Sequence, residues 1–265
     1  MSSGPDRQSP FITLHGRETT LVLEAPPGEA PLWRYWGPRL PDETSPRFRL
    51  RDARAAPSFS LHFDQPLSVF PGFGAGWFHQ SALLAHRSGA DFTHRPSAVR
   101  LERSGNGLRI ELEDEASSLQ IRLTMTLDSS TDLLTVASAL TNRGGAPLDV
   151  QWFAAATLPL PPEASRLRYF GGRHNREFEI IEEPLPRALW RRENRRGLTS
   201  HDAFPGALAL AHGAGADAGL VYAAQLAWSG NHAQTIERLD DGRRQWQLGE
   251  WLAPGEVRLA PGETL

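Results

Sequence analysis

Several residue types are missing from this sequence, and each absence excludes a class of function. There is no cysteine, which rules out disulfide bonds, thiolate metal sites and cysteine nucleophiles. Lysine is also absent, so all 28 basic residues are arginines, and the 31 acidic residues leave a net charge of −3. That balance gives no electrostatic reason to expect nucleic acid or an anionic membrane as a partner. No apolar run approaches the ~18 residues that a membrane-spanning helix needs.

The N-terminus also lacks the apolar core of a signal peptide. We therefore expect a cytoplasmic protein, with a disordered segment over residues 1–10 and one domain over residues 11–265. The nine histidines are not arranged at metal-ligand spacings; His79 and His86, for example, are seven positions apart. We expect neither a metal site nor a cofactor.

Helical periodicity is missing as well, and alternation typical of strands takes its place. Apolar residues occupy every second position of one long segment, at Leu119, Ile121, Leu123, Met125 and Leu127. An Asn-Gly pair before this segment is typical of a hairpin turn. We therefore predict a large antiparallel all-β sandwich with little helix.

The predicted strands share apolar or alternating patterns bounded by turn residues; they span residues 11–14, 20–24, 31–36, 58–63, 81–86, 98–103, 108–113, 119–127, 133–142, 147–158, 207–211, 219–228, 234–239 and 243–250. Residues 40–57 are predicted to form a loop. Residues 160–206, rich in arginine, glycine and proline, are predicted to be irregular.

Glycines alternate at Gly72, Gly74 and Gly76, which suggests a phosphate-binding loop. Trp77 and Phe78 follow, however, where such a loop would lead into a helix. Two interpretations remain: the loop contacts a ligand, or Gly76 to Phe78 anchors it to the core.

Acidic residues cluster at Glu111 to Glu115, Glu182/Glu183 and Asp240/Asp241. A glycosidase needs two carboxylates that flank the bond to be broken, about 5 Å apart in retaining enzymes. Because these clusters lie in or beside predicted turns, we interpret them as solvated charges.

The stretch Trp228 to His232 contains serine, glycine, asparagine and histidine in consecutive positions. A serine nucleophile and its base normally come from separated segments that meet in space. We therefore interpret Ser229 to Asn231 as a turn at the end of a buried strand. The segment Trp190 to Asp202 is dense in hydrogen-bonding groups, and it fits either a functional loop or an interface loop.

Four passages, in order along the chain, resemble the N-terminal domain of glycoside hydrolase family 36 α-galactosidases. They are Pro31 to Leu40, Trp190 to Asp202, Leu226 to His232, and Leu252 to Glu256 with Ala260 to Glu263. The resemblance covers the chain from about Leu14 onward. One departure is Leu198, where the family usually has arginine.

The resemblance implies a β-supersandwich of the galactose mutarotase type. In the family, this domain precedes a (β/α)8 barrel that carries both catalytic aspartates. A barrel alone takes about 250 residues, so we expect no barrel and no catalytic residue in this chain, and no hydrolysis by it alone. The family's Gly-Asp-Phe-Arg loop is similar to Gly76 to His79, which makes Trp77, Phe78 and His79 candidate substrate-binding residues.

Three hypotheses follow. The first is a non-catalytic domain of an α-galactosidase, which packs against the barrel, forms homo-oligomers and helps complete a sugar pocket. The second is a stand-alone mutarotase-like epimerase, for which His174 or His201 with Glu177 or Glu250 would supply the acid and base. The third is a carbohydrate-binding module. The galactoside, its linkage and the assembly state stay open.

Overall fold

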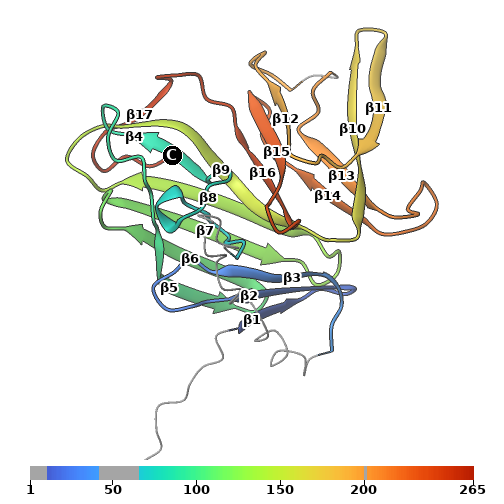
Figure 1. Cartoon of the computed structure of the whole chain (residues 1–265), viewed down its shortest axis with the longest axis horizontal. Coiled ribbons are helices and arrows are strands. Elements are labelled where there is room, and N and C mark those ends of the chain that lie inside the picture. Colours follow the sequence, from blue (N-terminus) through green and yellow to red (C-terminus); the bar gives the residue numbers. More distant parts are fainter. Residues whose placement is uncertain (1–10, 42–65, 200–201) are drawn as a thin grey trace, which may run out of the picture.

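A computed structural model describes residues 11–41, 66–199 and 202–265. Within them every strand pairing is antiparallel (Figure 1). The only helix in this part of the chain is the 3-10 turn η2 (Phe73–Ala75), and no helix there could cross a membrane. The antiparallel all-β class with little helix is therefore confirmed. The predicted disordered residues 1–10, strand 58–63 and nearly all of loop 40–57 lie outside the described residues.

The strands of the described residues form four sheets. The first contains β1 (Phe11–His15), β2 (Thr19–Glu24) and β3 (Leu32–Pro38). The second is a meander of β5 (Ser97–Ser104), β6 (Gly107–Asp114), β7 (Leu119–Leu127) and β8 (Leu134–Asn142). The third has the order β12 (Leu189–Asn194), β15 (His232–Arg238), β16 (Arg244–Glu250), β9 (Leu148–Leu160) and β17 (Val257–Leu259), with β4 (Leu83–His86) also on β9. The fourth has the order β11 (Arg176–Pro184), β10 (Ala164–Arg173), β13 (Gly206–Ala211) and β14 (Val221–Gln225).

The long strand β9 connects the two parts of the third sheet. Its N-terminal half pairs with β4 and β17, and its C-terminal half pairs with β16. The segment that leads into β4 contacts β15 and β16 through Gln80, although these strands are far away in the sequence.

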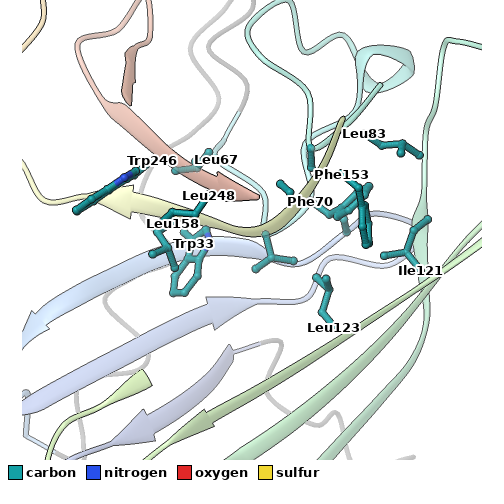
Figure 2. Close-up of a cluster of buried hydrophobic side chains, with 14 of the residues drawn as sticks. Trp33, Leu67, Phe70, Leu83, Ile121, Leu123, Phe153, Leu158, Trp246 and Leu248 are labelled. Atoms are coloured by element: carbon teal, nitrogen blue, oxygen red, sulfur yellow. The ribbon is translucent and has the colours of Figure 1, made fainter. Parts of the chain in front are cut away.

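The core lies where the meander faces β9 and β3. The five alternating apolar residues of β7 are all buried, as predicted. Figure 2 shows two of them, Ile121 and Leu123, in one cluster with Phe153 and Leu158 of β9 and Trp33 of β3. Burying each large apolar side chain stabilises the fold by about 1.5–3 kcal/mol, so this cluster holds three of the four sheets together.

Residues 160–206 are not irregular: they contain β10, β11 and β12, and that prediction was wrong. Charged side chains occupy many positions of the β10–β11 hairpin, so no apolar alternation marks it in the sequence. Cross-strand ion pairs stabilise it instead. Glu182 of β11 lies 2.7 Å from Arg168 of β10 and also pairs with Arg166.

The predicted buried strand over residues 219–228 is shorter and more exposed than expected. Only β14 forms there, and Trp228 beyond it is half exposed. Among the described strands, β14 lies at the edge of its sheet and pairs only with β13.

Candidate functional site

The segment Pro71 to Ala82, called here the Gly-rich loop, is a compact surface loop whose ends meet. The Ala82 amide donates to the Pro71 carbonyl oxygen at 2.8 Å. The Ala82 carbonyl accepts from the Ala154 amide of β9, also at 2.8 Å. Loops closed in this way are packed by their own side chains and frequently carry function.

Two glycines explain how this loop lies so close to its neighbour. The Gly74 amide donates to the His94 carbonyl oxygen at 2.9 Å. A Cβ atom at Gly74 would lie 2.3 Å from the Thr93 carbonyl oxygen, so no larger residue fits. Gly76 has φ of 80° and ends η2 in the left-handed conformation that glycine adopts without strain. The glycines therefore serve backbone geometry, and no phosphate site is needed to explain them.

Trp77 is the inner side chain of the loop. It is only 4% exposed and belongs to the hydrophobic core. Its indole N–H donates to the Gln80 carbonyl oxygen at 3.0 Å, and its ring meets His79 edge-on with centroids 5.3 Å apart. Of the two interpretations of Gly76 to Phe78, this burial favours the anchor for Trp77.

Phe78 points the other way and is 57% exposed. It packs edge-on against Phe73, with ring centroids 5.8 Å apart. The ring centroids of Phe73 and Phe92 are 6.5 Å apart. All three rings are exposed; we call them the Phe cluster. Exposed groups of large apolar residues usually mark a contact surface.

His79 faces the third sheet. Its Nδ1 lies 3.2 Å from Glu237 Oε1, and its Nε2 lies 3.9 Å from Asp240 Oδ2. The three predicted substrate-binding residues therefore differ in environment: one is buried, one is exposed, and one is paired with carboxylates.

The two polar segments around Asn194 and Asn231 come together at one end of the third sheet. The Gly197 amide donates to Asn231 Oδ1 at 2.7 Å, and the Thr199 amide donates to the Ser229 carbonyl at 2.6 Å. Asn194 donates to the Leu198 carbonyl at 2.6 Å. These side chains satisfy loop backbone groups, which accounts for the density of hydrogen-bonding residues in the sequence.

Ser229 lies in a bend, and His232 begins β15, as the turn interpretation requires. The His232 ring is buried, with Nδ1 3.1 Å from the Gly230 carbonyl oxygen. Burial lowers the pKa of His232 below its ordinary value. The histidine is thus a buried residue packed against its own turn, and its Nδ1 contacts a backbone carbonyl rather than Ser229.

Arg192 of β12 connects the third and fourth sheets. Its guanidinium lies 4.6 Å above the Tyr169 ring and donates to the carbonyl oxygens of Phe170 and Asp202. Trp190 packs against the same tyrosine, with ring centroids 5.3 Å apart. The segment Trp190 to Asp202 therefore has a structural role at this junction, apart from Ser200 and His201, which lie outside the described residues.

Comparison with known proteins identifies the family. The sequence profile described as the "Glycosyl hydrolase family 36 N-terminal domain" matches residues 29–260. The chain belongs to this family. The family 36 domain is 32% identical to an alpha-galactosidase of Escherichia coli, over 97% of this chain and 36% of that protein.

Solved structures share the fold of this family 36 domain. The galactosidase domain of the alpha-galactosidase–sucrose kinase AgaSK of Mediterraneibacter gnavus matches with a TM-score of 0.85 at 21% identity, over 98% of this chain and 40% of that one. The alpha-galactosidase AgaA of Geobacillus stearothermophilus matches with a TM-score of 0.84 at 22% identity, over 96% of this chain and 39% of that one. The chain therefore spans well under half of the length of these relatives.

The acidic residues of the family 36 domain differ in their surroundings. Asp114 ends β6 directly before the turn at residues 115–118, as predicted, but its side chain is buried rather than solvated. Glu111 lies within β6 and Glu182 within β11, so the predicted turn location was wrong for these two residues. Glu111 lies 2.9 Å from Arg109, and Asp114 accepts the Ser117 amide at 3.0 Å. Glu111 thus has a cation as its neighbour, and Asp114 has an amide.

Of the residues proposed for an epimerase, His174 and Glu177 lie together in the family 36 domain, and Glu250 lies in another sheet. His174 and Glu177 lie at the β10–β11 hairpin, which projects from the body of the molecule (Figure 1). His174 Nδ1 lies 3.8 Å from Glu177 Oε1, and the His174 side chain is 87% exposed. Glu250 lies in β16, in another sheet, where burial and then Glu256 raise its pKa. His201 is outside the described residues.

A small groove runs beside the Gly-rich loop of the family 36 domain. Its volume is about 180 Å³, and its walls include Glu29, Leu32, Phe70 and Arg95. Ligand pockets usually measure about 300–1,000 Å³, so the groove is too small for an oligosaccharide. Among the described residues, no group of three histidine, aspartate or glutamate side chains could hold a metal ion.

Proposed function

We propose that this chain is the non-catalytic N-terminal domain of a retaining α-galactosidase, in which a separate catalytic domain hydrolyses terminal α-galactosides. The observation that carries the proposal is the family match over residues 29–260. The four curated relatives are all named as alpha-galactosidases, and the chain spans 36% of the length of the most similar of these four. A domain of this size leaves room in those proteins for a barrel of about 250 residues.

In this proposal the four sheets together form a β-supersandwich that packs against the (β/α)8 catalytic domain and takes part in homo-oligomer formation. The exposed apolar residues support a domain with partner surfaces. They include the Phe cluster and, on β11, Phe178 and Ile180. Isolated surface hydrophobics are ordinary, but contiguous ones mark protein or ligand contacts.

The Gly-rich loop would help complete a sugar pocket through Phe78 and His79, with Trp77 as the anchor that fixes their positions. An aromatic ring can stack on the apolar face of a galactose ring, and an imidazole can hydrogen-bond to a hydroxyl group. Only these two side chains would come from this domain, so the pocket is incomplete without its partner.

A carbohydrate-binding module is the second candidate, and the exposed Phe cluster favours it. The two functions differ in what the chain does alone. A binding module holds a galactoside without any partner, whereas the proposed domain supplies only part of a pocket.

The test uses the purified chain with an aryl α-galactoside and, separately, with galactose and raffinose in a calorimeter. We expect no turnover above the buffer blank and no binding up to millimolar sugar. Turnover that remains after repurification would overturn the proposal, and saturable binding to the chain alone would establish the binding module instead.

A further inference from the structure

One carboxylate outside the Gly-rich loop holds two of its residues. Glu237 lies in β15, and its side chain is 18% exposed. Its Oε2 accepts the Gln80 backbone amide at 2.8 Å and the Gln245 side-chain amide at 2.9 Å. Its Oε1 lies 3.2 Å from His79 Nδ1. Both carboxylate oxygens are therefore used within this one cluster.

The Gln80 carbonyl oxygen is held as firmly as its amide. It accepts from the indole of Trp77 at 3.0 Å and from the side-chain amides of Gln245 and Gln247 at 3.0 and 3.2 Å. Both glutamines belong to β16 and are completely buried. A carbonyl oxygen has two lone pairs, so three donors converge on an acceptor that two would satisfy.

Stability alone does not explain such a cluster. Burying a polar group that is not hydrogen-bonded lowers the free energy of unfolding. Apolar residues of similar size would fill the same space without that desolvation penalty. A buried hydrogen-bond network does, however, favour a single conformation, because other arrangements leave more of its members unpaired. In this cluster Gln245 Oε1 has no partner in the described structure, while both oxygens of Glu237 have one. The cluster is built around one peptide group of a loop, which is the part of a fold most able to move.

The outward direction of Phe78 follows from its neighbours. Trp77 is held in the core on one side, and His79 faces Glu237 on the other. The opposite end of the loop is fixed by the Gly74 amide, which donates to the His94 carbonyl oxygen. With both flanking residues directed inward, Phe78 faces solvent beside Phe73.

We propose that Glu237 is a positioning residue: with Gln245 and Gln247 it holds the Gly-rich loop in the one conformation that presents Phe78 to a partner. The identity of what Phe78 contacts, a sugar ring, rests on the proposed function, but the ordering of the loop does not. Glu237 touches no sugar in this account and acts only through His79 and Gln80.

Hydrogen exchange of the full chain tests this role. We expect Glu237→Ala to increase the exchange rate of the Gln80 amide at least tenfold, while amides of β7 keep their rates. Glu237→Gln should have a smaller effect, because its side-chain oxygen can still accept the Gln80 amide. The matched control is Glu102→Gln on β5, whose partly exposed side chain pairs with Arg100; it should leave the loop unchanged.

Three results would overturn the proposal. The first is an unchanged Gln80 exchange rate in Glu237→Ala. The second is equal acceleration in β7, which would make Glu237 a general stabiliser. The third is that Glu237→Ala and Glu237→Gln both fail to fold, which would also make Glu237 a general stabiliser. Because the experiment uses neither sugar nor a catalytic domain, its failure is distinct from failure of the proposed function.

Discussion

Replacing Trp77 with alanine should destabilise the domain rather than alter an exposed surface. The indole is 4% exposed, lies in the core and donates to the Gln80 carbonyl oxygen. Truncating a buried tryptophan to alanine costs about 3–5 kcal/mol, from lost burial and the cavity left behind. For a domain of this size, each kcal/mol lowers Tm by about 2–4 °C, so we expect a decrease on the order of 10 °C.

Two variants separate the contributions of the ring and the hydrogen bond. Trp77→Phe keeps an aromatic ring but loses the donor and part of the buried ring volume, and the Gln80 carbonyl still has two other donors. It should cost about 1–2 kcal/mol, most of it from the smaller ring. Phe78→Ala removes a ring that is 57% exposed and should cost less than about 1 kcal/mol.

Urea unfolding followed by circular dichroism measures all three variants. The expected order of destabilisation is Trp77→Ala, then Trp77→Phe, then Phe78→Ala. A Trp77→Ala variant within about 1 kcal/mol of the parent would contradict the anchor role, and so would a Phe78→Ala variant that loses as much as Trp77→Ala.

Three further predictions concern the rest of the fold. Burial lowers the pKa of both His94 and His232 in the folded chain. Near the ordinary histidine pKa of about 6.5, the unfolded chain therefore binds more protons than the folded chain. The free energy of unfolding should fall as the pH is lowered from 7 to 6, and a constant or rising value would contradict this. Trp152→Phe should lower the free energy of unfolding by about 1–3 kcal/mol more than Trp246→Phe does. The reason is that Trp152 Nε1 donates to Gln247 Oε1 at 3.1 Å, whereas the buried Trp246 Nε1 has no partner in the described structure. Equal urea midpoints for the two variants would refute this prediction. Gly74→Ala should destabilise the chain by about 1–3 kcal/mol, because the added Cβ would clash with the Thr93 carbonyl oxygen. The control Gly145→Ala should not destabilise the chain, because there is open space around Gly145. Equal Tm values for the two variants would refute this prediction.

The sequence predicted most strongly those strands that bury one face and expose the other. In β7, alternate apolar residues are all buried, since the period of two in the sequence matches the pleat of the strand. The β10–β11 hairpin was missed because arginine and glutamate pair across its strands, as Arg168 and Glu182 do. No hydrophobic period marks a hairpin stabilised in that way.

The candidate site was predicted only in part. The unusual glycine spacing and the resemblance directed attention to Gly76 to His79, and the structure confirms that this segment is a defined surface loop. Neither indicated which of its side chains is buried. Glu237 was not singled out, because it contacts Gln80 across 157 positions of sequence. A contact of that kind depends on how β15 lies beside the loop, and the local sequence pattern does not predict it.

In the proposed function, this chain completes an α-galactosidase whose chemistry belongs to another domain. The direct test is a chimera in which this chain replaces the matching segment of the Escherichia coli relative, to which it is 32% identical. We predict that the chimera hydrolyses an aryl α-galactoside, and that the same relative without the segment does not. A folded chimera of the correct mass that has no activity, beside an active parent, would contradict the account.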